Sequence, residues 1–195
     1  MDIILASASP RRREILSALG LSFRVVTSDA DESLEERDPR RAVEVLSRRK
    51  GEAVRDRLLA AGECLDGTLI ISSDTVVSID GEILGKPRDR EDACRMLRLY
   101  SGRTHEVISG ICLIRGDTVA VSHEATEVAF EEMSEEQIAA YVDRNAPYDK
   151  AGAYAIQGAA SAYITGIHGD YFNVVGLPVH RMHRLYFENF GENLF

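Results

Sequence analysis

The sequence has few cysteines and no long apolar run, and both absences narrow the classes of protein that it encodes. Its three cysteines, Cys64, Cys94 and Cys112, are odd in number and form no C-x-x-C pair, which argues against a disulfide framework and a zinc site. No stretch of about 18 apolar residues occurs, and the N-terminal run Ile3 to Ala6 is too short for a signal peptide. We therefore expect a reduced, cytoplasmic protein that does not span a membrane.

The chain also lacks an excess of positive charge and a low-complexity linker. Its formal net charge is -9 and its isoelectric point is near 5.1, whereas general nucleic-acid binding needs a broad positive face. A local basic cluster must therefore bind any polyanion, which suits a small phosphorylated ligand. The 195 residues, 45% of them hydrophobic, suffice for one sizeable core. We expect residues 1–195 to form a single domain, either as one unit or as two lobes that share a sheet.

The N-terminal stretch IILASASPRRRE, residues 3–14, predicts a strand, a turn and a helix that begins at Pro10. Proline is favoured at the first helical position, and Ser9 before it is a suitable N-cap. The turn offers backbone N–H groups, two hydroxyls (Ser7 and Ser9) and three arginines, Arg11 to Arg13, where the helix dipole already favours anions. Because arginines oppose the dipole at this end, the pattern indicates a phosphate ligand; a solvated helix surface is the alternative.

An acidic loop and a charged helix follow a short predicted strand at residues 23–26. The loop contains Asp31 and Glu32, and the helix begins at Pro39, with apolar residues at helical spacing and one densely charged face. Within that face lies Lys50. The chain has three lysines, and the other 20 of its 23 basic residues are arginine. A lysine among so many arginines indicates a site that needs a compact point charge, although such charge runs usually mean a solvated face.

The stretch TLIISSDTVVSIDGEILGKP, residues 68–87, places Asp74 between two β-rich runs. The runs are Leu69 to Ile71 and Val76 to Ile79. A carboxylate there must be paired, hydrogen-bonded or bound to a metal, because a bare charge in apolar surroundings is costly. Asp80-Gly81 predicts a hairpin turn. Lys86 follows, but the glycine spacing before it is one residue short of a Walker A loop and Pro87 replaces the hydroxyl residue, so we reject a P-loop.

The middle of the chain predicts further regular structure with little chemical signal. We expect a helix at residues 90–99, paired strands at 107–114 and 118–130, and a helix that opens with the capping box S-E-E-Q at Ser134. Four of the five histidines lack further ligands at suitable spacing, so we interpret them as structural: His105, His123, His180 and His183.

Residues 149–178 form a glycine-rich stretch that also carries an amide and several aromatic side chains. Its polar and aromatic members are Gln157, Tyr154, Tyr163, Tyr171 and Phe172. Glycine at this density indicates tight turns that let backbone approach a ligand closely. Small residues, an amide and aromatic faces are what a base-binding pocket requires; tyrosines packed in a core beside glycine turns are the alternative.

Together these stretches resemble the Maf family of nucleoside triphosphate pyrophosphatases over nearly the whole chain. The matching motifs are S-A-S-P-R-R at 7–12, S-D-T-V-V at 73–77, S-G-R-T-H at 101–105 and D-K-A-G-A-Y-A-I-Q-G at 149–158. The resemblance implies an α/β fold like that of inosine triphosphate pyrophosphatase, with an elongated mixed sheet flanked by helices and two lobes around a central cleft. The last motif resembles the family branch that acts on dTTP and UTP.

The resemblance also implies divalent-metal-dependent hydrolysis of the nucleotide to its monophosphate and pyrophosphate, in a house-cleaning role. Modified pyrimidine nucleotides stay open as substrates. Such hydrolysis needs a metal on phosphate oxygens, cations for the departing pyrophosphate and a base for the attacking water. The resemblance assigns Asp74 as the base and a metal ligand, and Glu32 as the second ligand of Mg or Mn, with Asp31 as an alternative.

The substrate-binding residues implied are Ser7, Arg11, Arg12, Lys50, Thr75, Lys86 and Gln157. Two residues depart from the family pattern: Ser73 replaces a small Ala or Gly, and Ala155 replaces a Gly that is common there.

A nucleotide-binding interaction protein in cell division is the competing class, since the family name derives from septum formation. A sensor needs only cations, whereas a catalyst needs an ionised carboxylate aimed at the phosphate, so Asp74 favours the enzyme. A kinase is least favoured because no P-loop is present. The expected partner is the nucleoside triphosphate substrate, with no nucleic acid and no membrane; a homodimer stays open.

Overall fold

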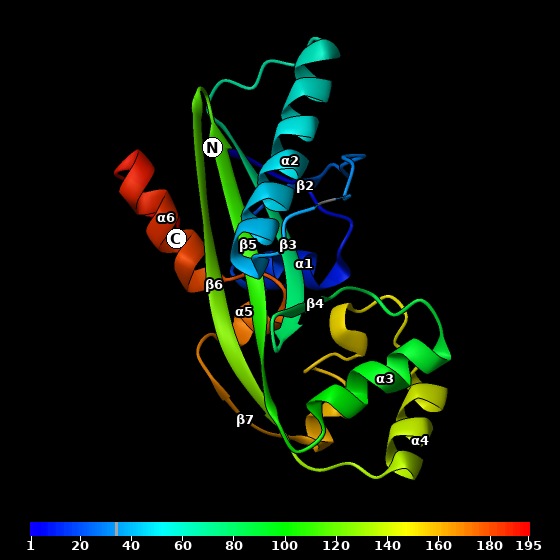
Figure 1. The fold of residues 1–195 in the computed structure, drawn as a ribbon. Helices are drawn as coiled ribbons and strands as arrows, with labels where there is room; N and C mark the ends of the chain where they lie inside the picture. Colours follow the sequence, from blue (N-terminus) through cyan, green and yellow to red (C-terminus); the bar gives the residue numbers. More distant parts are fainter. Residues whose placement is uncertain (34) are drawn as a thin grey trace.

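The computed structural model describes residues 1–33 and 35–195, and its centre is one seven-stranded mixed sheet (Figure 1). The strands are β1 (Asp2–Leu5), β2 (Arg24–Val25), β3 (Thr68–Ile79), β4 (Glu82–Leu84), β5 (Thr104–Arg115), β6 (Thr118–Phe130) and β7 (Ile164–His168). Their order is β2-β1-β3-β5-β6-β7, with β4 paired to β3. β1 runs parallel to β2 and β3, and the other pairs are antiparallel. The predicted elongated mixed sheet is confirmed.

Three long strands give the sheet its elongated shape. β3, β5 and β6 have 12, 12 and 13 residues, and at about 3.3 Å per residue each extends about 40 Å. The two β-rich runs predicted on either side of Asp74 are confirmed, and residues 72–75 join them into one strand. They pair in register with β5, where Asp74 lies opposite Gly110. Asp74 thus occupies the middle of a continuous strand.

Helices cover both faces of the sheet (Figure 1). They are α1 (Pro10–Ala18), α2 (Pro39–Ala60), α3 (Arg90–Tyr100), α4 (Glu135–Asn145), α5 (Tyr171–Val175) and α6 (Val179–Phe190), with 3₁₀ turns η1 (Ala151–Ala153) and η2 (Ala159–Ala162). The capping box at Ser134 is confirmed, with Gln137 as its partner. Ser9 occupies the N-cap position of α1, but within the described residues its side chain makes no capping bond. None of the described helices is long and apolar enough to cross a membrane.

Successive side chains of β1 point to opposite faces of the sheet, and each face carries its own apolar layer in the first lobe. Ile3 and Leu5 belong to an apolar cluster with residues of α1 and α6, whereas Ile4 points to the opposite face and belongs to a cluster with α2. Each fully buried side chain of this size stabilises the fold by about 1.5–3 kcal/mol. This end of the sheet, with α1, α2 and α6, forms the first lobe.

The other end of the sheet carries a second lobe. Helices α3 and α4 pack there on the far parts of β3, β5 and β6, around a cluster that includes Tyr100, Phe130 and Tyr141 (Figure 1). The sheet runs through both lobes, which matches the expected arrangement of two lobes. Segments of both lobes line one cavity.

Candidate active site

A cavity of about 560 Å³ is lined by segments of both lobes, and its wall brings together nine of the residues that the sequence predicted for the site. The predicted residues in its wall are Ser7, Arg11, Arg12, Glu32, Lys50, Asp74, Thr75, Lys86 and Gln157. They come from the β1–α1 turn, the first turn of α1, the loop before α2, α2, β3, the β4–α3 loop and the segment after η1. Asp31, the alternative metal ligand, lies outside this wall and hydrogen-bonds to Ser33 instead.

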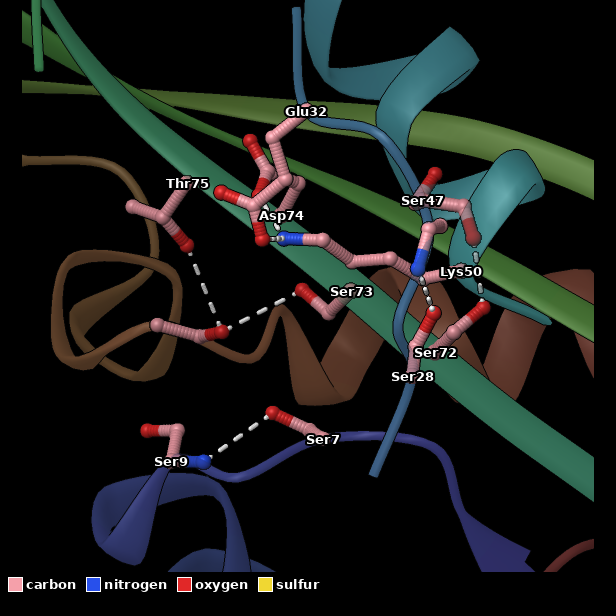
Figure 2. A network of polar contacts seen from close by, with 12 residues as sticks. Ser7, Ser9, Ser28, Glu32, Ser47, Lys50, Ser72, Ser73, Asp74 and Thr75 are labelled. Carbon is pink, nitrogen blue, oxygen red and sulfur yellow. Dashed lines mark hydrogen bonds and ion pairs between the residues drawn. The ribbon is translucent and has the colours of Figure 1, made fainter. Parts of the chain in front are cut away.

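Two carboxylates share one ammonium group at the centre of the cavity (Figure 2). Nζ of Lys50 lies 2.6 Å from Oδ1 of Asp74 and 2.9 Å from Oε1 of Glu32. The side chains of Lys50 and Asp74 are only 13% and 14% exposed, so this pair is poorly screened by water. The hydrogen bond from Lys50 lowers the pKa of Glu32, and the charge of Lys86 acts in the same direction. The expectation that Asp74 must be paired is confirmed.

The two carboxylates fit a divalent cation that is bound together with a substrate. Mg²⁺ is usually held by one or two carboxylates plus phosphate oxygens and water, instead of by a full cage of protein ligands. Asp74 and Glu32 supply two carboxylates within reach of one point, that occupied by Nζ of Lys50. The described residues contain no group of three or more His, Cys, Asp or Glu that would form such a cage.

Arg12 is buried and holds three segments together. Its Nε donates to the carbonyl oxygen of Gly176 at 2.8 Å, Nη1 to Oγ of Ser7 at 3.1 Å, and Nη2 to Oγ1 of Thr75 at 3.1 Å. Burial lowers the pKa of Arg12, and the nearby charge of Asp74 opposes that shift. A guanidinium has five N–H groups, so two remain for a ligand in the cavity. Arg12 therefore orders the wall as well as offering charge.

The remaining cations of the cavity wall lie in the first turn of α1 and on the loop that follows β4. Arg11 lines the cavity from the first turn of α1, and Lys86 lines it from the β4–α3 loop. Neither residue forms an ion pair with any other residue in the described ranges. Their charges are therefore available to an anion, whereas that of Lys50 is already shared by two carboxylates.

Part of the glycine-rich segment that was expected to bind a base, residues 154–157, also lines the cavity. Gln157 is exposed to the cavity, and its amide has no hydrogen-bond partner among the described residues. Tyr154 also lines the cavity, and its hydroxyl lies 2.7 Å from Nε2 of His105. The other expected aromatics do not line it in the described part of the chain: Tyr163 packs beside the second-lobe cluster, and Tyr171 and Phe172 are exposed on α5.

The sequence matches the model of the Maf-like protein family over residues 2–188. The chain belongs to the Maf family. A dTTP/UTP pyrophosphatase of Symbiobacterium thermophilum is 49% identical over 92% of this chain and 90% of its own length. A protein of the same name from Thermococcus onnurineus is 45% identical over 97% of this chain and 98% of its own. The solved Ham1 protein of Staphylococcus aureus aligns with a TM-score of 0.48 at 15% identity, over 67% of this chain and 72% of that chain.

Of the two departures from the Maf pattern, Ser73 adds a hydrogen bond and Ala155 causes no backbone strain. Oγ of Ser73 donates to the carbonyl oxygen of Gly176 at 3.2 Å, so this extra hydroxyl reinforces the contact that Arg12 makes (Figure 2). Ala155 needs no left-handed backbone, because the positive φ angles of this segment fall on Gly152 at 68° and Ala153 at 61°.

Sequence reasoning missed one acceptor in this Maf protein. The carbonyl of Gly176 accepts hydrogen bonds from Arg12 and Ser73. Gly176 lies 164 residues after Arg12 in the sequence. A backbone oxygen carries no side-chain signature. The nearest signal is Gly176 itself, whose φ of 127° ends α5 with a sharp change of direction.

Proposed function

We propose that the protein is a nucleoside triphosphate pyrophosphatase that hydrolyses dTTP and UTP to the nucleoside monophosphate and pyrophosphate. The observation that supports it best is the pairing of Asp74 and Glu32 with one ammonium inside a cavity that also holds Arg11 and Lys86, which form no ion pair with another described residue. The names of the relatives, dTTP/UTP pyrophosphatase, support the choice of substrate.

The residues divide into three roles around the triphosphate. Asp74 accepts a proton from the water that attacks the α-phosphorus. Arg11, Lys86 and the free N–H groups of Arg12 hold the β and γ phosphates, whose charge increases as pyrophosphate departs. Lys50 leaves the carboxylates for the phosphate oxygens when the substrate enters.

A divalent cation, Mg or Mn, held by Asp74 and Glu32 would supply charge neutralisation at the phosphate oxygens. The fit rests on the two carboxylates that meet at Nζ of Lys50. We expect chelation to abolish hydrolysis and either ion to restore it.

Gln157 is placed to select the base. The pairing edge of uracil and thymine presents an acceptor, a donor and an acceptor, and a glutamine amide offers one donor and one acceptor side by side. Cytosine reverses two of these three groups, so an amide that the bound complex holds in the orientation for uracil would place like groups against each other. An unsatisfied buried group costs about 1–3 kcal/mol, or roughly 5- to 150-fold in discrimination.

The function is tested with a panel of standard and modified nucleoside triphosphates and separate detection of pyrophosphate and orthophosphate. We expect UTP and dTTP to be hydrolysed in preference to CTP, with monophosphate and pyrophosphate as the products. Modified pyrimidine triphosphates in the same panel test the house-cleaning role. Diphosphate and orthophosphate as the main products would contradict the proposal.

Base selection is tested with Gln157→Ala. The variant should lose kcat/KM for UTP much more than for CTP, because only uracil matches the amide. The UTP-to-CTP ratio should decrease by roughly 5- to 150-fold. Equal losses on both nucleotides would show that Gln157 is a structural residue of the turn.

A further inference from the structure

A buried histidine lies behind the wall of the cavity that carries Tyr154. His105, the second residue of β5, is 2% exposed, and its Nε2 lies 2.7 Å from the hydroxyl oxygen of Tyr154. Its ring centroid lies 4.3 Å from that of Tyr100 and 5.5 Å from that of Phe130. Tyr154 packs against the same two rings. The pair is therefore enclosed by aromatic side chains on the side away from the cavity.

This hydrogen bond anchors the segment that presents Gln157. In the described structure, Tyr154 makes the one side-chain hydrogen bond of residues 151–158, whose other members are mostly alanine and glycine. Other ties are a backbone bond from Gly152 N–H to the carbonyl of Gly85 at 2.9 Å, a hydrogen bond between the Tyr141 hydroxyl and the backbone of Ala155, and the packing of Ile156 on the first-lobe cluster. Gln157 follows Tyr154 by three residues and has no hydrogen bond of its own among the described residues. The bond to Tyr154 is thus one of the contacts that hold the backbone from which the Gln157 amide projects.

The chemistry of the pair suits an anchor and not a proton carrier. Burial lowers the pKa of His105 to about 3, so the imidazole is neutral near pH 7. Burial also raises the pKa of the Tyr154 hydroxyl well above its ordinary value, so that group stays protonated. A neutral hydrogen bond between two enclosed groups fixes geometry without exchanging charge with the cavity.

We propose that His105 is a positioning residue for base recognition: by hydrogen-bonding Tyr154, it fixes residues 151–158 and so holds the Gln157 amide against the nucleobase. The inference rests on the proposed function. The triphosphate end of the cavity is built from other segments, the β1–α1 turn, α2, β3 and the β4–α3 loop. Loss of the anchor therefore weakens base recognition and leaves phosphate binding in place.

Three variants separate the hydrogen bond from the bulk of the side chain. His105→Gln places an amide atom near the position of Nε2, whereas the shorter His105→Asn places it near Nδ1 and does not reach Tyr154. Tyr154→Phe keeps the ring and removes the hydroxyl. The asparagine variant is thus the matched control for the glutamine variant, with the same functional group at a different length.

We expect His105→Asn and Tyr154→Phe each to lower the UTP-to-CTP ratio of kcat/KM by about 5- to 10-fold, chiefly through KM for UTP. His105→Gln should keep most of the wild-type ratio. The double variant His105→Asn/Tyr154→Phe should lose no more than either single variant, because both remove the same bond. The affinity for inorganic triphosphate, measured by calorimetry without metal, should stay within about twofold of wild type.

An unchanged UTP-to-CTP ratio in folded Tyr154→Phe overturns the inference, as does an equal loss of inorganic triphosphate binding. Thermal unfolding of each variant confirms that it is folded. If wild-type protein hydrolyses neither UTP nor CTP, the proposed function fails. In that case, the affinities of the same variants for UMP and CMP, measured by calorimetry, test the positioning role alone. The preference for UMP should decrease in His105→Asn and Tyr154→Phe and persist in His105→Gln.

Discussion

Asp74 shows how one residue combines burial with charge. It lies in the middle of β3 between two runs of buried residues, and the ammonium of Lys50 lies 2.6 Å away. Removing one partner of a buried ion pair is costly because the other charge is left unpaired. Here Lys50 also pairs with Glu32 at 2.9 Å, so the loss of one carboxylate leaves the ammonium with another. The arrangement tolerates change at Asp74 better than an isolated pair would.

We therefore predict that Asp74→Asn separates activity from stability. The substitution keeps the shape but removes the proposed base and one of the two carboxylates proposed to hold the metal, so kcat should decrease by about 10² to 10⁴. The free energy of unfolding should change by only about 1 kcal/mol, since Glu32 still pairs with Lys50. Steady-state kinetics in saturating metal and urea unfolding measure the two effects. More than about a tenth of wild-type kcat would show that Asp74 is not the base.

His105 gives the protein a defined dependence of stability on pH. Burial lowers the pKa of His105 from 6.5 to about 3. Below pH 6.5 the unfolded chain therefore binds a proton that the folded chain does not, and stability decreases as the pH falls from 6.5 toward 3. This one group should reduce the free energy of unfolding by about 2 kcal/mol between pH 7 and pH 5.

Urea unfolding at the two pH values measures this contribution, with His105→Gln as the control that lacks a titrating ring. The variant should lose about 2 kcal/mol less than wild type over the same interval. If both proteins lose the same amount, His105 does not titrate as its burial requires.

At the scale of residues, the sequence predicted which charged side chains line the cavity and missed the uncharged groups that support them. Arg12 and Asp74 gave a signal because arginines oppose the dipole at a helix N-terminus and a carboxylate between β-rich runs needs a partner. His105 gave no such signal, because its partner Tyr154 lies 49 residues away and a lone histidine is weak grounds for any site. The carbonyl of Gly176 gave none either, since every residue has one.

At the scale of elements, the approach of α2 to the sheet determines where Lys50 lies. A Cβ atom added at Gly110 in β5 would lie only 2.1 Å from the carbonyl oxygen of Val43 in α2, so only glycine allows this distance. Gly110 lies opposite Asp74 in the pairing of β3 with β5. The close contact thus places α2 over that part of β3, and Lys50 reaches Asp74 from it.

We predict that Gly110→Ala forces α2 off the sheet. The added Cβ would clash with backbone atoms of α2, which cannot move aside as a side chain can by changing rotamer. The free energy of unfolding should therefore decrease by about 3 kcal/mol or more. Denaturant unfolding measures the loss. Gly166→Ala in β7 is the matched control, because no atom lies within 4 Å of its added Cβ, and it should change stability by less than about 0.5 kcal/mol. Similar stability of the two variants would contradict the close approach.

Elements with local signals were predicted, and those that depend on distant pairing were not. The Asp80-Gly81 hairpin and the Ser134 capping box are confirmed, since each is specified by neighbouring residues. The β-rich runs on either side of residues 72–75 were predicted, but no local signal shows that the four polar residues between them continue the strand. Pairing with β5, about 35 residues further along the chain, supplies the order that local propensity does not.

At the scale of the whole molecule, the cavity joins the two lobes. The composition alone left one unit or two lobes open, and it was the family resemblance that favoured two lobes. The cavity wall draws on residues as far apart as Ser7 and Gly176, and Arg12 links these two directly. A ligand bound there contacts segments of both lobes, so its binding free energy stabilises the entire fold and not one element.

We therefore predict that a UTP analogue with a methylene bridge between the α and β phosphorus atoms raises the melting temperature of the protein. A ligand that binds only the folded state at 100 times its Kd adds about 2.7 kcal/mol, which corresponds to roughly 5 to 10 °C for a chain of this length. The equivalent CTP analogue at the same concentration should give a smaller shift, because its base mismatches Gln157. Asp74→Asn should retain a shift, since it removes the base and not the cations. Equal shifts for the two analogues would contradict base selection, and no shift for either would contradict nucleotide binding in this cavity.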